Sequence, residues 1–381
     1  MPKPTTPLLA IILLPALLCG QQPKSKEPAG PALRPSSQAL TISGVAVAAE
    51  SFNPFRGERI TLHYTISRDA RVTVKVFDPD RQFARALSNN VVRKAGRVTE
   101  SWDGKDLDGK IVPNEAYFFT IEAQDSTAHK TVYDPVTFSG GEFGNITRGQ
   151  LDRESGTMTY KLSQPSRILY RAGLASGLLF KTIVDWEPRS SGTVTEYWNG
   201  RDEDNLLDVL SLKGNVMVMT YMTLPDTSVI TIGNDKLTYR AYKRAVATRR
   251  PMKEDRPVAN ARKLSPHFLK SRLTDRAFGV KVAFPDFDKS GQPPAIPSVK
   301  DRALIQLSIA DIDREVLAGQ QFEIMVHVDT NFLLEEERGY VPFTAPIEVK
   351  QIPPGEHTLT INLITFGDQI AVGSRKFRVV R

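Results

Sequence analysis

The chain has 381 residues, of which 40% are hydrophobic and 24% are charged, and its formal net charge at pH 7 is +7. This length allows about three domains with ordinary hydrophobic cores. The single cysteine, Cys19, excludes an intramolecular disulfide framework. If Cys19 serves as an anchor, thiolate catalysis and thioether-linked haem are excluded as well.

The amino-terminal segment has the pattern of an export signal. Its apolar run, Leu8 to Leu18, contains Pro15 and spans eleven residues, whereas a membrane span needs about 20 apolar residues. The run therefore predicts a secretory signal peptide over residues 1–19. Cys19 stands where a bacterial lipoprotein signal places its acylated cysteine. The resemblance to a lipobox implies lipidation of Cys19, and the alternative is an ordinary signal peptide that carries the cysteine away.

Residues 20–41 are rich in Gln, Pro, Ser, Lys and Ala and contain few large apolar residues. Such a composition cannot bury enough apolar surface to offset the entropy of ordering. We expect this segment to be a disordered tether, partly extended by its prolines.

Residues 42–144 show short stretches in which apolar and polar residues alternate. Examples are Ile60 to Ile66 and Val72 to Val76. A period of two over four to seven residues predicts half-buried β-strands. The glycine-rich stretch 139–144 marks the expected end of this module.

The sequence then repeats itself at a fixed offset of 96 residues. Tyr64 recurs as Tyr160, and the block that begins at Trp102 (WDGKDLDG) recurs from Trp198 (WNGRDEDN). The repeat predicts two tandem copies of one module, over 42–144 and 145–239. Each copy has the size of an antiparallel β-sandwich, about 100 residues. Both tryptophans are expected to be core or turn anchors, with sugar-stacking platforms as the alternative.

The first copy resembles a known family. The stretch from Tyr64 to Ser67, followed by Gly96 to Tyr117, is similar to the Ig-like domain of the flagellar hook-capping protein FlgD. The second copy matches this pattern only through the stretch from Trp198 to Asp202. The resemblance implies an Ig-like fold and does not imply a role in flagellar assembly, because a fold alone does not define a function.

Residues 240–298 form a basic linker in this interpretation. From Arg240 to Arg276 it holds twelve Lys or Arg against three acidic residues. Such a cluster attracts anionic lipid, acidic glycan or an acidic protein face, and the alternative is a solvated spacer. Nucleic acid is not an expected partner of an exported chain without a recognition motif. The candidate interaction residues are Arg249, Arg250, Lys253, Arg262, Lys263, Lys270 and Arg272.

Residues 299–381 again contain strand-like alternation and predict a third Ig-like sandwich. The acidic run Glu335 to Glu337 lies within it. The predicted fold class is therefore all-β, with three immunoglobulin-like β-sandwiches in series.

One loop has a composition that suits calcium. Asp103, Asp106 and Asp108 stand at spacings that supply oxygen ligands, as Ca²⁺ prefers. The alternative is a turn in which the aspartates bond backbone amides. No other cofactor is expected.

These features predict a non-catalytic, exported envelope protein, periplasmic or attached to the outer membrane through a lipid anchor. Its five histidines form no recognisable metal or catalytic motif. Its sandwiches would bind or position an envelope protein partner. The alternative is a carbohydrate-binding module for cell-wall or surface glycan, with Tyr340 and Phe343 as candidate contact residues.

Overall fold

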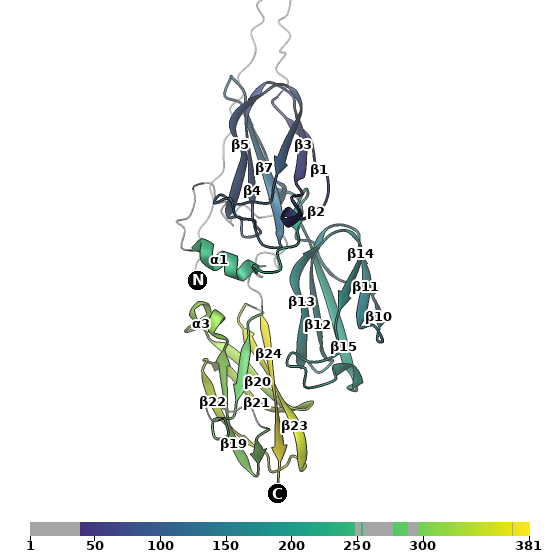
Figure 1. The fold of residues 1–381 in the computed structure, drawn as a ribbon, viewed down its shortest axis with the longest axis vertical. Helices are drawn as coiled ribbons and strands as arrows, with labels where there is room; N and C mark the ends of the chain where they lie inside the picture. Colours follow the sequence, from purple (N-terminus) through teal and green to yellow (C-terminus); the bar gives the residue numbers. More distant parts are fainter. Residues whose placement is uncertain (1–38, 248–252, 254–276, 289–295, 368) are drawn as a thin grey trace, which may run out of the picture. The chain divides into compact units, whose positions relative to one another are not determined.

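The computed structural model describes residues 39–247, 253, 277–288, 296–367 and 369–381. Over these residues the chain is mainly β-structure, arranged as two-layered sandwiches (Figure 1). This confirms the predicted fold class of three immunoglobulin-like sandwiches in series. In that described part, no helix combines the length and the apolar character needed to cross a membrane.

The first sandwich follows the alternation in the sequence. In β3 (Ile60–Ile66) every second side chain is buried, beginning with Ile60, as expected for a strand with one face on the core. One sheet is ordered β1 (Ile42–Val47), β3, β6 (Gly96–Trp102). The other is ordered β2 (Ser51–Phe52), β16 (Val229–Thr231), β7 (Ala116–Gln124), β4 (Ala70–Phe77), β5 (Phe83–Arg93), and β8 (Lys130–Tyr133) also pairs with β7.

Strand β16 departs from the expected division of the chain. Residues 229–231 belong to the second module in the expected division, but Val229 pairs with Tyr117 of β7 and Ile230 pairs with Ser51 of β2. The pairing is stable there because both apolar side chains of β16 become buried. The first sandwich is therefore completed by a strand that follows the second sandwich in the chain.

The second sandwich has a smaller core. One sheet is ordered β10 (Gln150–Asp152), β11 (Thr157–Leu162), β14 (Gly192–Tyr197), and the other β13 (Leu179–Arg189), β12 (Ser166–Leu174), β15 (Asn215–Thr223), β9 (Phe143–Asn145). A short 3₁₀ helix, Val209–Ser211, replaces the extended stretch of the first copy before β15. Figure 1 shows β12, β13 and β15 as one layer and β10, β11 and β14 as the other.

The third sandwich begins earlier than expected. One sheet is ordered β17 (Val280–Ala283), β19 (Arg302–Ile309), β22 (Phe343–Glu348), and the other β18 (Ser298–Val299), β24 (Ile370–Val379), β23 (Gly355–Thr365), β20 (Phe322–Val328), β21 (Asn331–Gly339). Strand β17 lies within the expected basic linker. It joins this sandwich because Val280 and Val282 pack against its core and Phe284 is fully buried.

Two α-helices and two further 3₁₀ turns complete the described chain. Helix α1 (Tyr239–Ala247) follows β16, and α3 (Asp311–Leu317) follows β19. The 3₁₀ turns are Pro54–Arg56 and Pro135–Thr137. Helix α1 was not expected, although Tyr239, Tyr242 and Val246 have the spacing of one helical face.

Candidate functional site

The repeated tryptophan loop is a structural element in both copies. Trp102 and Trp198 are 1% and 3% exposed. The indole Nε1 of Trp102 donates to the carbonyl of Lys105 at 2.9 Å, and that of Trp198 donates to the carbonyl of Arg201 at 2.8 Å. Each ring thus anchors its loop to the core, which confirms the prediction of core or turn anchors. Neither buried ring can serve as a sugar-stacking surface.

Two of the three candidate calcium residues, Asp103 and Asp106, each use one carboxylate oxygen to bond amides within the loop. Asp106 is buried, and its Oδ1 accepts from the amides of Asp108 and Lys110 at 3.0 and 2.9 Å. Asp103 Oδ1 accepts from the amide of Lys105 at 3.2 Å. The described residues contain no group of three or more potential metal ligands. These contacts are those of the turn alternative, and calcium binding stays a prediction without support from the geometry.

Helix α1 carries the start of the basic segment onto the first sandwich. The Tyr242 hydroxyl donates to Asp106 Oδ2 at 3.4 Å. Lys243 Nζ lies 3.6 Å from Asp78 and 2.5 Å from Asp80. Burial, opposed by Lys243 and reinforced by Asp80, raises the pKa of Asp78 to about 7. Part of the predicted basic interaction segment therefore binds acidic side chains of this same chain.

The remaining candidate residues of the basic segment are not placed. Arg249, Arg250, Arg262, Lys263, Lys270 and Arg272 lie outside the described residues, as does Cys19. Lys253 is described and is an exposed turn residue.

A polar triad of a buried tyrosine, a buried glutamate and a partly exposed arginine recurs at the repeat offset and was missed in the sequence. Tyr64 donates to Glu100 at 3.4 Å, and Arg93 bonds the same carboxylate at 2.8 Å. In the second copy, Tyr160 donates to Glu196 at 3.0 Å and Arg189 binds it with two nitrogens. Burial and the neighbouring glutamate raise the pKa of both tyrosines. Equal spacing of the three residues in both copies was the available signal.

A buried ion pair joins the first two sandwiches. Arg167 of β12 lies 2.6 Å from Glu115, which directly precedes β7, and the two side chains are 1% and 0% exposed. Arg167 also donates to the carbonyl of Trp186 at 2.9 Å. The backbone amide of Glu115 also donates to the Thr231 hydroxyl of β16 at 3.1 Å. This polar junction fixes β16 and both sandwiches to one another.

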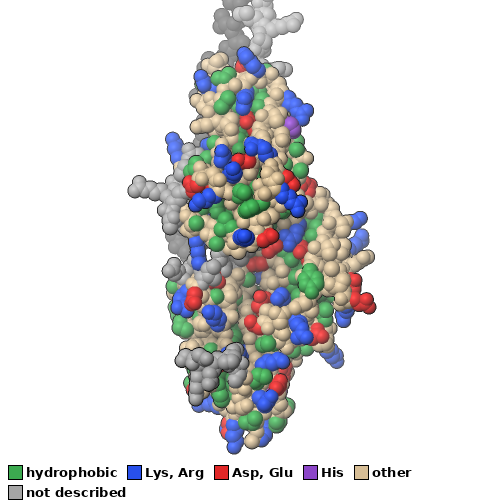
Figure 2. Space-filling model, viewed as in Figure 1, with side chains coloured by type: hydrophobic (Ala, Val, Ile, Leu, Met, Phe, Trp, Pro, Cys, Tyr) green, Lys and Arg blue, Asp and Glu red, His purple; other side chains and the backbone are tan. Residues whose placement is uncertain are grey.

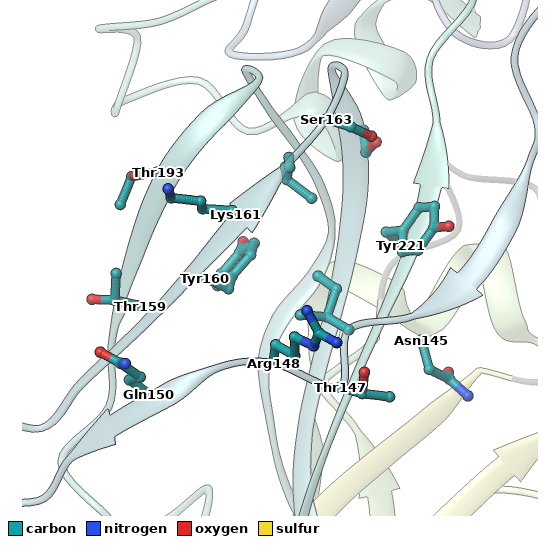
Figure 3. Close-up of a pocket in the computed structure, with 13 residues that line it drawn as sticks. Asn145, Thr147, Arg148, Gln150, Thr159, Tyr160, Lys161, Ser163, Thr193 and Tyr221 are labelled. Carbon is teal, nitrogen blue, oxygen red and sulfur yellow. The ribbon is translucent and has the colours of Figure 1, made fainter.

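The second sandwich contains an open pocket of about 540 Å³. It lies between β11 and β14 on one side and β15 on the other, and the connection from β9 to β10 also lines it (Figure 3). The lining is rich in hydroxyl and amide groups, and it includes two cations, Arg148 and Lys161. The lining residues are Asn145, Ile146, Thr147, Arg148, Gln150, Thr159, Tyr160, Lys161, Leu162, Ser163, Ser166, Thr193 and Tyr221.

The outer edge of β21 in the third sandwich is a second candidate surface. Among the strands that the structure describes, β21 ends its sheet and pairs only with β20. Glu335, Glu336 and Glu337 are exposed along it. Phe332 at its start and Tyr340 just after it are 57% and 53% exposed.

The aromatic pair named for glycan binding is divided. Tyr340 is exposed, but its hydroxyl accepts from the Gln321 amide at 2.9 Å. Phe343 packs against the core of the third sandwich. The two rings therefore do not form the exposed pair that the glycan alternative required.

Charge is otherwise distributed without a dominant sign on the surface in view. Figure 2 shows Lys and Arg interspersed with Asp and Glu over the described part of that face. A mixed surface of this kind creates no strong long-range field. Local clusters such as the β21 edge and the second-sandwich pocket are therefore the informative features.

No family model matches the chain, and no curated protein matches it. Among solved structures, FlgD from P. aeruginosa is 23% identical, over 26% of this chain and 73% of that chain, with a TM-score of 0.20. Fibronectin(III)-like modules of CbhA from Clostridium thermocellum are 10% identical over 89% and 93%, with a TM-score of 0.18. At such TM-scores these similarities carry no argument about function.

The fold class of the protein is therefore defined by the arrangement of its sheets. It is an all-β protein of Ig-like sandwiches, in which the first two are interlocked by a returning strand.

Proposed function

We propose that this protein is an exported, lipid-anchored, non-catalytic envelope protein whose sandwiches bind and position another protein. The observation that carries the proposal is the acidic outer edge of β21. A strand at the end of a sheet offers a row of backbone donors and acceptors to a partner strand.

The side chains on this edge select the partner. Within the described residues, Glu335, Glu336 and Glu337 form no ion pair with a basic side chain. Two copies of β21 brought together would oppose like charges, which is destabilising. An extended segment rich in Lys or Arg would instead neutralise them, so the expected partner strand is basic.

The interlocked first two sandwiches supply the positioning. The buried pair of Glu115 and Arg167 and the shared strand β16 hold them in one unit. Acylation of Cys19 and the tether over residues 20–41 would connect this unit to a membrane. Two attachment signals are usually needed for stable anchoring, and the basic segment over 240–276 would supply an electrostatic one.

Site-specific photocrosslinking in the native host tests the proposal. A crosslinking amino acid at Glu336 is expected to capture one envelope protein reproducibly, whereas the same group at Lys350, an exposed turn residue of the same sandwich, captures none. Replacing Glu335, Glu336 and Glu337 by Lys should abolish that capture. Binding of the identified partner should also weaken with added salt, because exposed charges are screened within about 8 Å at physiological ionic strength.

Two outcomes would contradict the proposal. Equal capture from both positions would mean that the edge has no special role. Mass spectrometry of the N-terminal peptide tests the anchor separately: an acylated Cys19 supports it, and a mature terminus beyond Cys19 refutes it.

A further inference from the structure

We infer that the pocket of the second sandwich binds an acidic saccharide. This inference is independent of the edge of β21 and concerns a different sandwich. It rests on the size of the pocket, on its lining and on the two cations within that lining.

The pocket lies beside a part of β11 whose outer edge has no partner strand among the described residues. In the first sandwich, β1 pairs with β3 as far as Ile66, and the Ser67 amide donates to the carbonyl of Thr41 at 3.2 Å. In the second sandwich, β10 pairs with β11 from Thr157 to Thr159 and no further. The next stretch of the chain, residues 160–163, lines the pocket instead.

The size of the opening suits a small ligand. Its volume of about 540 Å³ lies within the range of about 300–1,000 Å³ that is typical of small-molecule sites. A partner strand is a poorer occupant, because the flanking edge strands β9 and β10 have only three residues each.

The lining matches the hydrogen-bonding needs of a sugar. Vicinal hydroxyl groups both donate and accept, and the side chains of Asn145, Thr147 and Gln150 offer both functions. Tyr221 presents a half-buried ring, over which the chain passes at Gly144. A Cβ at that glycine would lie 2.8 Å from the ring, so the close approach requires glycine.

The two cations specify a negative charge on the ligand. Arg148 extends from the connection between β9 and β10 toward the space between Tyr160 and Tyr221, and Lys161 lies on β11 (Figure 3). Neither forms an ion pair with any residue that the structure describes, and none of the lining residues is acidic. A guanidinium and an ammonium beside hydroxyl groups fit the carboxylate of a uronic acid.

Calorimetric titration of the mature chain with trigalacturonate tests the assignment. Saturable binding is expected, with a neutral trisaccharide, maltotriose, binding at least about tenfold more weakly, because a hydrogen bond to a charged group contributes about 1.5–3 kcal/mol. Arg148→Gln and Lys161→Gln should each weaken trigalacturonate binding by about tenfold or more. Arg153→Gln, an exposed residue outside the pocket in the same sandwich, is the matched control and should bind normally.

A variant that fills the pocket tests the site even if any loss of positive charge weakens binding of an anionic ligand. Thr193→Trp adds bulk at an exposed lining position without changing charge, and it should abolish binding while far-ultraviolet circular dichroism remains unchanged. Equal binding of a glutamate tripeptide would overturn the saccharide assignment in favour of an acidic peptide. Unsaturable binding of trigalacturonate, or binding that Thr193→Trp leaves intact, would overturn the pocket itself.

Discussion

The buried pair between Arg167 and Glu115 gives the sharpest stability prediction. Both side chains are inaccessible and their closest atoms lie 2.6 Å apart. Removing one partner leaves the other charge buried without compensation, which typically costs about 3–5 kcal/mol. We therefore expect Arg167→Met and Glu115→Gln each to lower the free energy of unfolding by about that amount. The double variant should cost less than the sum of the two, because neither charge is then left alone.

Urea unfolding followed by tryptophan fluorescence is the appropriate assay. The three tryptophans are Trp102, Trp186 and Trp198, so the signal reports the first two sandwiches and not the third. Since β16 joins these sandwiches, a single transition should move as a whole. Arg153→Met provides an exposed control in the same sandwich, with an expected change within about 0.5 kcal/mol. Additive single-variant losses, or a loss below about 1 kcal/mol for Arg167→Met, would refute the coupling argument.

Three further predictions concern the same unit. The pKa of Asp78 is raised from its ordinary 3.8 to about 7, so its contribution to stability is present below about pH 4 and is lost as the pH rises to about 7. In a pH series of urea midpoints, Asp78→Asn should remove this decline in stability. An unchanged decline would exclude Asp78 as its source. Thr231→Val should lower the free energy of unfolding by about 1–3 kcal/mol in the same assay, because the Thr231 hydroxyl donates to the carbonyl of Pro113 and accepts from the amide of Glu115. An unchanged midpoint would argue against the pairing of β16. Gly104 and Gly109 both have positive φ, but only at Gly104 would a Cβ meet Pro54, at 2.3 Å. Gly104→Ala should therefore lower the thermal midpoint more than Gly109→Ala, whose cost is the backbone strain of about 1–2 kcal/mol, and equal shifts would contradict the packing argument.

The sequence predicts the sandwich fold because the fold is encoded locally. Alternation in stretches such as Ile60 to Ile66 reports which face of a strand is buried, and the 96-residue repeat reports the number of similar units. The tryptophan loops were predictable for the same reason, since Trp102 and Asp106 act within a few residues of one another.

The partner of an edge strand is not encoded locally. Val229 to Thr231 is a short apolar run that would suit the edge of either sandwich, and only the tertiary environment selects β7 over β15. The pocket could not be predicted for the same reason, because it depends on where β10 stops pairing with β11. The contact of Lys243 with Asp78 and Asp80 joins residues more than 160 positions apart in the sequence. At that separation, charge alone does not predict which residues pair.

The return of β16 sets the order in which the molecule can fold. Synthesis starts at the amino end of the chain, yet Glu115 and Thr231 must meet across 116 residues before the first sandwich is complete. Contacts of such long range slow folding, since the loop entropy is lost before the contacts form. A nascent chain that ends at residue 144 exposes an open edge on β7, and open edges promote aggregation. The first sandwich, although synthesised first, can therefore be completed only after the second has been made, and until then the edge of β7 at Ala116 and Tyr117 lacks its partner strand.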